Sequence, residues 1–381
     1  MRILVDIVHP AHVHFFRHAI AELQTRGHRV LVTVRAKENT LELLRELRIP
    51  FTRVSTQQRG LVALGKELLS RNLKIFRLCR HFRPDVLTGI AGMSVAPVGW
   101  LLRKPAIVFD DTEHATLSHR ISFPFATQIC TPDCYKDDLG RKQVRYPGYH
   151  ELAYLHPDRF DPDSSVLNEV GLREGYRVIL LRFVSWAAAH DVDQKGLSDR
   201  DKVGIVRELE RFGRVVVSSE GPLPPSIADR RFSGSPARMH HLLSYCSLYL
   251  GEGATMASEA AVLGVPSIYL NPLRMGYVEE QERKYGLLYS ARDKNEATRK
   301  AVSLLEDAET AEKWQQRRRH MLDDKVDVTA WTVDCLESCI SSETRFGAAR
   351  GLVTVFRRRA AVAQPLRRYL QRSPTPLSPR D

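Results

Sequence analysis

Residues 251–272 read GEGATMASEAAVLGVPSIYLNP and follow the short apolar run Leu248–Leu250. This order predicts a strand, a glycine-containing turn, a helix that opens at about Thr255, and a second strand. The start of such a helix presents backbone N–H groups and the positive end of a dipole to an anion. Because Gly251 and Gly253 have no side chains, a phosphate can approach the main chain closely there. The stretch therefore predicts a phosphate-binding strand–turn–helix unit.

The helix of this unit extends the prediction to a nucleotide. Thr255 is expected to be its N-cap, and Ala254 comes directly before it. Glu259, one turn into the helix, can accept hydrogen bonds from two hydroxyl groups at once, which suits the ribose of a nucleotide. The third glycine of the dinucleotide fingerprint is absent, so a nicotinamide is not favoured and no cofactor is expected. A plain strand–helix–strand unit whose glycines only turn the chain is the alternative.

Short apolar runs alternate with helical patterns on both sides of this stretch, which favours parallel sheets with helical crossovers. The expected strands are residues 3–8, 29–34, 51–54, 85–88 and 106–109 in the first half, and 178–182, 214–218, 248–250 and 267–270 in the second. A segment rich in proline and glycine, Tyr146–Pro162, separates the halves. We predict two Rossmann-like α/β domains that face each other across a cleft, over residues 1–155 and 165–340, and a partly disordered tail over 341–381.

The composition is that of a globular protein. The chain has 381 residues, of which 43% are apolar and 27% charged, so it can bury two ordinary cores. It contains no run of 18 apolar residues, and its opening MRILVDIVHP is typical of a first strand rather than of a signal peptide. Six cysteines without a C-x-x-C pair indicate reduced, buried thiols. These features predict a cytoplasmic protein.

The net charge of +12 is unevenly distributed. Residues 341–381 contain nine arginines, no lysine and two acids, whereas the rest of the chain is only mildly basic. The body therefore does not support nucleic-acid binding. In the tail, apolar residues and arginines alternate at roughly helical spacing. It is either a basic amphipathic helix that contacts the inner face of a membrane or a solvated extension.

The loop between the first expected strand and helix reads HPAHVHFF, residues 9–16. It follows the carboxyl end of a parallel strand, where open α/β folds bind ligands. His12 is a candidate general base toward an acceptor hydroxyl, or a donor to a phosphate. His9, His12 and His14 also resemble part of a zinc site, but no fourth ligand follows at a usual spacing, so no metal is predicted. Capping or packing at the helix start is the third interpretation.

The stretch FDDTEHA, residues 109–115, follows another expected strand and gathers three carboxylates. Asp111 and Glu113 are candidate catalytic residues, because a carboxylate at this edge can act as a base or bind acceptor hydroxyls. The alternative is a group of acids that only stabilises the N-terminus of the next helix.

Two loops at strand ends of the second half carry further candidates. In RFVSWAAAHD, which begins at Arg182, the guanidinium can pair with two oxygens of a diphosphate and Ser185 can line the sugar pocket. In SSEGP, Ser219 and Glu220 are candidates for contacts with the nucleotide. A surface arginine and an ordinary turn with polar caps are the alternatives.

Seven stretches are together similar to an uncharacterised GT-B-like domain family of archaea and bacteria: DIVHPAHVHFF, VFDDTEHA, RYPGYHELAYL, LRFVSWAAAHD, SSEGPLP, MHHLLSYCSLYLGEGATMASEAAVLGVP and QERKYGLLY. The family is grouped with the glycosyltransferase that makes lipid II and with the non-hydrolysing UDP-GlcNAc 2-epimerases. The resemblance implies that Gly253, Ala254 and Thr255 hold a diphosphate. It also implies that Glu259 holds the ribose and that Gln281 contacts the sugar.

The expected function is a metal-independent GT-B glycosyltransferase that uses a nucleoside diphosphate sugar, with UDP as the expected nucleotide. Its expected partners are this nucleotide sugar, bound to the second domain, and a glycan or lipid-linked acceptor, bound to the first, in cell-surface polysaccharide or glycolipid synthesis. A nucleotide-sugar 2-epimerase that uses the carboxylates near Asp111 is the first alternative. A scaffold that binds a nucleotide sugar without turnover is the second. A peripheral location at the membrane follows if the tail binds lipid.

Overall fold

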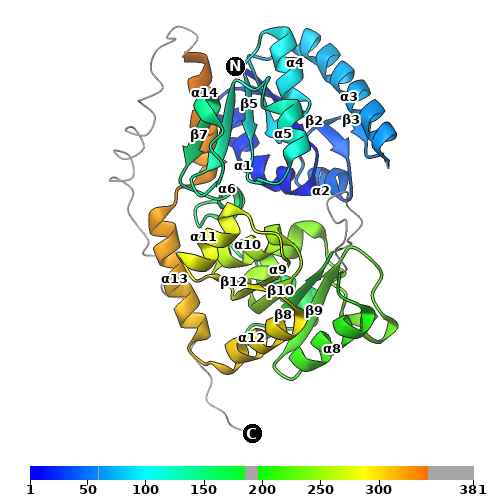
Figure 1. The fold of residues 1–381 in the computed structure, drawn as a ribbon, viewed down its shortest axis with the longest axis vertical. Helices are drawn as coiled ribbons and strands as arrows, with labels where there is room; N and C mark the ends of the chain where they lie inside the picture. The colour runs from blue at the N-terminus through cyan, green and yellow to red at the C-terminus, as the bar shows by residue number, and fades with distance from the viewer. Residues whose placement is uncertain (59, 185–195, 342–381) are drawn as a thin grey trace. The chain divides into compact units, whose positions relative to one another are not determined.

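The computed structural model describes residues 1–58, 60–184 and 196–341, and residues up to Leu336 form one compact unit (Figure 1). The unit contains two separate parallel β-sheets, which confirms the predicted pair of Rossmann-like arrays. Within the described ranges, every helix is too short or too polar to traverse a bilayer. Ser185 and the tail proposed to contact a membrane lie outside the described residues.

The first sheet has seven strands in the order β3-β2-β1-β4-β5-β6-β7. They are β1 (Arg2–Ile7), β2 (Arg29–Ala36), β3 (Thr52–Thr56), β4 (Val86–Ile90), β5 (Ala106–Phe109), β6 (Gln128–Pro132) and β7 (Gln143–Tyr146). Their connections contain α1 (Pro10–Thr25), α2 (Thr40–Glu46), α3 (Leu61–Phe82), α4 (Val95–Leu102), α5 (Thr116–Ser122) and the 3₁₀ turn η1 (Gly140–Lys142). All four residues of β5 are buried, as expected for a strand covered by helices on both faces.

The second sheet has five strands in the order β12-β11-β10-β8-β9. They are β8 (Val178–Phe183), β9 (Arg214–Ser219), β10 (Cys246–Gly251), β11 (Ser267–Leu270) and β12 (Leu288–Ala291). Its helices are α8 (Asp199–Leu209), α9 (Met239–Ser244), α10 (Ala254–Leu263), α11 (Gly276–Arg283) and α12 (Lys294–Glu306), with 3₁₀ turns η2 (Pro225–Arg230) and η3 (Pro236–Arg238). In both sheets the strand order reverses once, beside β1 and beside β8, where folds of this kind bind ligands.

The remaining helices connect or follow the sheets. They are α6 (Leu152–Leu155), α7 (Val166–Glu169), α13 (Thr310–Asp324) and α14 (Val328–Ser341). Trp331 of α14 packs on Tyr146 of β7 with ring centroids 4.8 Å apart, and the Thr329 hydroxyl donates to the carbonyl of Ala153 at 2.6 Å. The chain therefore returns to the first sheet after completing the second. Below, the first lobe is the first sheet, its connecting helices, α6 and α14. The second lobe is the second sheet, its connecting helices, α7 and α13.

Candidate functional site

The turn after β10 is built by close backbone packing. Gly251 pairs with Arg182 of the neighbouring strand β8. A Cβ atom at Gly251 would lie 2.4 Å from the Tyr249 hydroxyl oxygen and 2.7 Å from the Arg182 Cβ, so only glycine fits. At Gly253 an added Cβ would meet the Val184 side chain at an ordinary 3.6 Å. The two glycines thus differ: the first is required by packing, and the second keeps the approach to the helix open.

Helix α10 starts one residue earlier than the sequence predicts. Its N-cap is Gly253, whose backbone is extended, and its first residue is Ala254. The prediction that Thr255 is the N-cap is therefore wrong, because the extended conformation already ends at Gly253. Thr255 lies exposed in the first turn, and no acid is present there to neutralise the helix N-terminus. This end of α10 can accept an anion.

Glu259 is held by one residue from each lobe. Its side chain is only 5% exposed, and its Oε1 accepts hydrogen bonds from the Tyr154 hydroxyl at 2.8 Å and from Nε2 of His240 at 2.9 Å. Tyr154 belongs to α6 and His240 to α9. The ring of His14, from α1, lies edge-on to His240 with centroids 4.4 Å apart. The carboxylate predicted to bind ribose is thus fixed in orientation within a mostly buried polar cluster.

Arg182 and Glu220 lie together beside the turn. One guanidinium nitrogen of Arg182 donates to the Ser218 hydroxyl at 2.7 Å, and another donates to Oε1 of Glu220 at 2.7 Å. The Ser219 hydroxyl instead donates to the carbonyl of Gly221 at 3.0 Å, within its own loop. The structure therefore places Arg182 next to Gly251 with its guanidinium already oriented by the loop after β9.

Glu252, between the two glycines, was not predicted to have a role. It is buried, and its carboxylate accepts hydrogen bonds from the backbone N–H of Val184 at 3.1 Å and of Leu197 at 3.2 Å. These bonds connect the turn to Val184, directly after β8, and to Leu197. The sequence signal for this residue is an acid between two glycines, which is also what an exposed turn would contain.

In the first lobe, the candidate His12 lies in the first turn of α1. Its Nδ1 accepts a long hydrogen bond of 3.4 Å from the backbone N–H of Val8. Burial, together with the neighbouring imidazoles of His9 and His150, lowers the pKa of His12 well below its usual value. The ring is therefore neutral at physiological pH, which is the form that a general base requires.

Asp111 forms an ion pair with a residue that the sequence did not single out. Its Oδ2 lies 3.0 Å from Nδ1 of His150, and the Thr112 hydroxyl donates to its Oδ1 at 2.9 Å. Burial alone would raise the pKa of Asp111, but the charge and hydrogen bond of His150 outweigh it, so the pKa is lowered. Conversely, burial acts to lower the pKa of His150, and Asp111 raises it above the usual value. The pair is charged on both sides.

Glu151, the next residue, is a second acid that sequence reasoning missed. It is 2% exposed, and burial followed by the charge of Asp111 raises the pKa of its carboxyl to about 8. His150, Glu151 and Tyr154 all belong to RYPGYHELAYL, a stretch that the sequence marked as familial without assigning it a role. The available sequence signal was that these three polar side chains lie beside the apolar residues Leu152, Ala153 and Leu155. This segment adjoins both Asp111 and Glu259.

Glu113 and Gln281 each form hydrogen bonds within the protein. Oε1 of Glu113 accepts from the backbone N–H of Gly276, the first residue of α11, at 2.9 Å, and from that of Lys136 at 3.2 Å. Gln281 is fully buried, and its amide donates to the Ser258 hydroxyl at 2.7 Å. Glu113 therefore stabilises the N-terminus of α11. Gln281 contacts α10 through Ser258, the residue that directly precedes Glu259.

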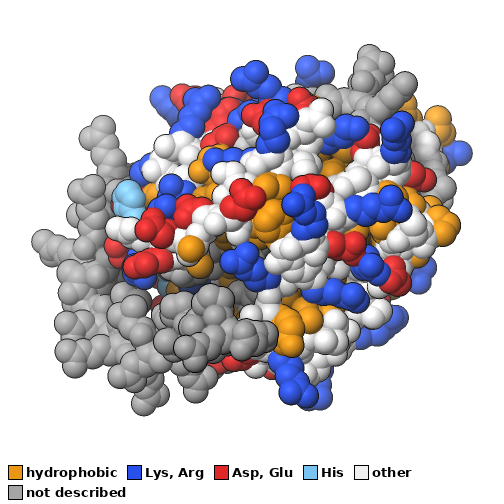
Figure 2. All heavy atoms as spheres, turned by 90° about the horizontal axis from the view of Figure 1, so that it is seen from below, with side chains coloured by type: hydrophobic (Ala, Val, Ile, Leu, Met, Phe, Trp, Pro, Cys, Tyr) orange, Lys and Arg blue, Asp and Glu red, His pale blue; other side chains and the backbone are white. Residues whose placement is uncertain are grey.

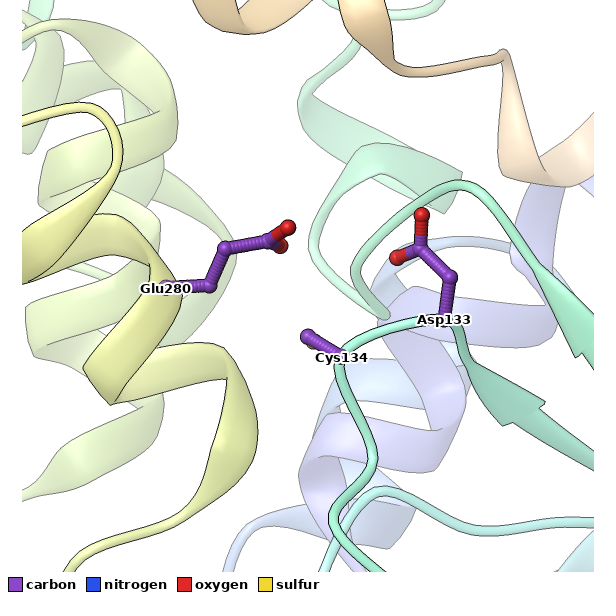
Figure 3. A group of neighbouring side chains, drawn as sticks. All are labelled: Asp133, Cys134 and Glu280. Atoms are coloured by element: carbon purple, nitrogen blue, oxygen red, sulfur yellow. The ribbon is translucent and has the colours of Figure 1, made fainter.

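Asp133, Cys134 and Glu280 form the cluster among the described residues whose spacing resembles a metal site (Figure 3). The ammonium group of Lys325 lies 2.8 Å from a carboxylate oxygen of both Asp133 and Glu280. Burial raises the pKa of the Cys134 thiol, so it stays protonated. The buried lysine thus supplies the positive charge that balances these acids, and the cluster is a partly exposed ion-pair network.

A groove between α8 and α12 lies outside this set of residues. Its volume is about 690 Å³, and Asp201 and Lys294, which form an ion pair, are among the residues that line it. None of the predicted site residues lines this groove. The described candidates instead lie in α10 and its preceding turn, at the ends of β8 and β9, in α11, at the start of α1 and in the loop after β5.

The sequence matches the model of a family described as "Protein of unknown function (DUF354)" over residues 1–203 and 233–335. The chain belongs to the DUF354 family. A curated relative at 22% identity is an uncharacterised protein of Methanocaldococcus jannaschii, matched over 73% of this chain and 85% of that protein. A second relative, at 23% identity, is a UDP-N-acetylglucosamine–N-acetylmuramyl-(pentapeptide) pyrophosphoryl-undecaprenol N-acetylglucosamine transferase of Bacillus cereus, matched over 52% of this chain and 56% of the transferase.

Solved structures place this DUF354 chain in the GT-B fold. A putative UDP-N-acetylglucosamine 2-epimerase from Listeria monocytogenes superimposes with a TM-score of 0.67 at 13% identity, covering 91% of this chain and 97% of the epimerase. A spinosyn rhamnosyltransferase complexed with thymidine diphosphate gives 0.60 at 15% identity, covering 88% and 100%. The predicted GT-B class is therefore confirmed. At these identities the two neighbours show the fold and leave the reaction open.

Proposed function

We propose that this DUF354 protein is a metal-independent glycosyltransferase that binds a nucleoside diphosphate sugar, with UDP as the expected nucleotide, through the second lobe. The observation that carries the proposal is the arrangement of α10. Its open N-terminus follows the tight Gly251 turn beside Arg182, and Glu259 lies five residues further on. Five residues of helix rise about 7.5 Å, a separation comparable to that between a nucleotide's diphosphate and its ribose hydroxyls.

In this proposal, different residues around the turn bind different parts of the donor. The N–H groups at Gly253, Ala254 and Thr255 receive the diphosphate, and charge that develops on it during transfer is stabilised by the helix end and by Arg182. Both hydrogen bonds that hold Glu259 end on Oε1, so Oε2 is the oxygen we assign to the ribose. Tyr154 and His240 are then positioning residues for this carboxylate.

On the first lobe, we assign the acceptor to the start of α1, which carries His12, and to the loop after β5, which carries Asp111. His12 is neutral and Asp111 ionised, so each can take a proton from an acceptor hydroxyl. Oε1 of Glu113 accepts from two backbone N–H groups, one of them at the start of α11, whereas the buried Oε2 has no hydrogen-bond partner. In this proposal Glu113 holds α11 through Oε1, and Oε2 is the oxygen that can contact an acceptor hydroxyl.

Calorimetric titration of the full-length protein with UDP, GDP, dTDP and CMP tests the donor site. We expect one diphosphate to bind, and Glu259→Ala to weaken its binding by about tenfold or more, because a carboxylate–hydroxyl hydrogen bond is worth roughly 1.5–3 kcal/mol. Glu312→Ala, at an exposed position of α13, is the matched control and should bind like the wild type. Unchanged affinity in Glu259→Ala would remove the site assignment.

A 2-epimerase is the second candidate, and two observations favour it. The Listeria epimerase matches nearly the whole chain. The first lobe also offers an ionised acid, Asp111, beside a protonated one, Glu151, which is a pairing that proton abstraction and return require. Incubating the protein with a UDP-sugar in heavy water distinguishes the two reactions. Deuterium at C2 without any acceptor supports epimerisation, and transfer only in the presence of an acceptor hydroxyl supports the transferase.

A further inference from the structure

Exposed large apolar side chains are concentrated on one side of the first lobe. Eight such side chains occur among the described residues, and seven of them lie on three helices: Leu61, Val62, Leu69 and Leu73 on α3, Trp100 and Leu101 on α4, and Leu117 on α5. The eighth, Tyr176, precedes β8 in the second lobe. Helix α4 packs against both α3 and α5, and Figure 1 shows the three helices on one side of the sheet. We name this surface the α3–α5 face.

Helix α3 has two opposite stripes. Its buried residues Glu67, Arg71, Ile75 and Cys79 recur every four positions and face the sheet. The outer stripe contains Val62, Lys66, Leu69, Leu73, Arg77 and Arg80, which recur every three or four positions and are all exposed. The outer face of a helix on a water-facing surface is expected to be polar throughout, but here leucines that are 72% and 49% exposed occupy its middle.

The charge of the α3–α5 face has a single sign. The three helices contain one acid, Glu67, which is buried and paired with Arg35 at 2.7 Å. Exposed bases border the leucines on α3, and Arg103 and Lys104 follow α4 while Arg120 lies on α5. By contrast, the face in Figure 2 shows Lys and Arg side chains interspersed with Asp and Glu. The α3–α5 face is therefore both apolar and positively charged.

An anionic lipid surface complements both properties. A second copy of the chain would place bases against bases, which opposes an isologous dimer. Nucleic acid would contact the bases but offers no apolar phase to the leucines, and Trp100 is the one exposed aromatic ring on the face. We propose that the α3–α5 face docks the protein on an anionic bilayer, with the aliphatic side chains entering the interface and the bases contacting lipid phosphates.

This docking rests on side chains of the first lobe alone. It does not depend on the tail or on the transferase proposal, because no residue of the α3–α5 face belongs to the candidate site. If the transferase proposal also holds, the acceptor-binding lobe is the one that touches the membrane, which suits a lipid-linked acceptor.

Vesicle flotation of the full-length protein tests the proposal. Vesicles of phosphatidylcholine alone are compared with vesicles in which about a third of the lipid is phosphatidylglycerol. We expect binding to the anionic vesicles, weakened about 10- to 100-fold by Leu69→Gln with Leu73→Gln. Arg77→Gln with Arg80→Gln should weaken it roughly 10- to 30-fold and reduce its salt dependence.

The matched controls alter the same residue types elsewhere. Tyr176→Gln removes the exposed apolar residue outside the face, and Arg200→Gln with Arg299→Gln removes two exposed bases of α8 and α12. Both controls should bind vesicles within about twofold of the wild type. All these residues are exposed, so thermal unfolding should be unchanged in every variant, and each variant retains the tail.

Three results would overturn the docking proposal. The first is wild-type protein that floats with neither vesicle, and the second is a Leu69/Leu73 variant that floats like the wild type. The third is a wild-type dimer in solution whose mass halves in that variant, which would make the face an interface between copies. Nucleotide affinity, measured on the same variants, should be unchanged, so failure of this proposal and failure of the donor site are distinguishable.

Discussion

The two lobes contribute candidate residues in different ways. In the second lobe, the Gly251–Glu259 segment is defined by backbone: a strand end, a glycine that nothing larger can replace, and a helix N-terminus. In the first lobe, the start of α1 and the loop after β5 are defined by side-chain pairs, above all Asp111 with His150. A backbone-defined site can be read from the order of residue types. A pair between residues 39 positions apart cannot, because the chain alone does not show which strand ends meet.

The largest expected effect tests the side-chain pair. Asp111→Asn should cost about 3 kcal/mol of unfolding free energy, because it leaves a buried His150 without its counter-charge. The lowered pKa of Asp111 means that its contribution is lost as pH falls through that pKa, and the raised pKa of His150 means that its contribution is lost as pH rises through that pKa. The difference from wild type should therefore be largest between the two values.

Denaturant unfolding over a pH series measures this difference. Asp199→Asn, at an exposed position of α8, is the control and should show little change at any pH. A destabilisation by Asp111→Asn that does not vary with pH would contradict the ion pair and leave only packing.

The next effect tests the backbone-defined site. Gly251→Ala should lower the unfolding free energy by about 2 kcal/mol, because the new Cβ overlaps the Tyr249 hydroxyl and the Arg182 side chain. Gly253→Ala is the matched control, with an expected cost below about 1 kcal/mol. Chemical denaturation of both variants decides the matter, and equal costs would show that the turn is less tightly packed than the structure has it.

A smaller effect tests the contact between lobes. Tyr154→Phe removes one of the two hydrogen bonds that orient Glu259, and we expect nucleotide affinity to fall by about 1 kcal/mol, or roughly fivefold. Tyr149→Phe also removes a tyrosine–glutamate bond, but that bond involves Glu280. Titration calorimetry should show a loss for the first variant only. Equal losses would point to general loosening rather than to positioning of Glu259.

The last prediction concerns a dependence on pH that follows from the raised pKa of Glu151, which is about 8. A carboxyl that holds its proton more tightly when folded destabilises the protein as pH rises from the unfolded value toward the folded one. Relative to Glu151→Gln, the wild type should therefore lose several kcal/mol of unfolding free energy between about pH 4.5 and 8, because each unit of pKa shift corresponds to about 1.4 kcal/mol. Parallel pH profiles of unfolding for the two proteins would contradict the burial of an uncharged acid.

The sequence predicted most of the fold, and its errors have identifiable causes. Strands β6, β7 and β12 were missed because polar residues interrupt their apolar pattern, and the first two begin with glutamine. Helix α4 was missed because it contains a proline and Gly99, where an added Cβ would lie 3.0 Å from Ala106 on the neighbouring strand. The glycine there serves close helix–strand packing, which only the assembled sheet reveals.

Part of the candidate site could likewise be predicted from the sequence, and part could not. Gly251, Arg182 and Glu259 follow from strand ends and helix starts, and the structure brings them to one region. The partners Tyr154 and His150 could not be predicted, because each comes from an element far from the carboxylate that it contacts. Nor does spacing show that Glu113 contacts a helix of the other lobe.

The return of α14 to the first sheet makes the first lobe discontinuous in sequence. Trp331 and Cys335 complete the surroundings of Tyr146 and Cys130, although nearly two hundred residues separate them in the chain. The polypeptide consequently crosses between the lobes twice, and two covalent crossings permit rotation about the line that joins them while opposing a free swivel. A fragment that ends after β7 would lack part of its own core, so the first lobe is best studied within the intact chain.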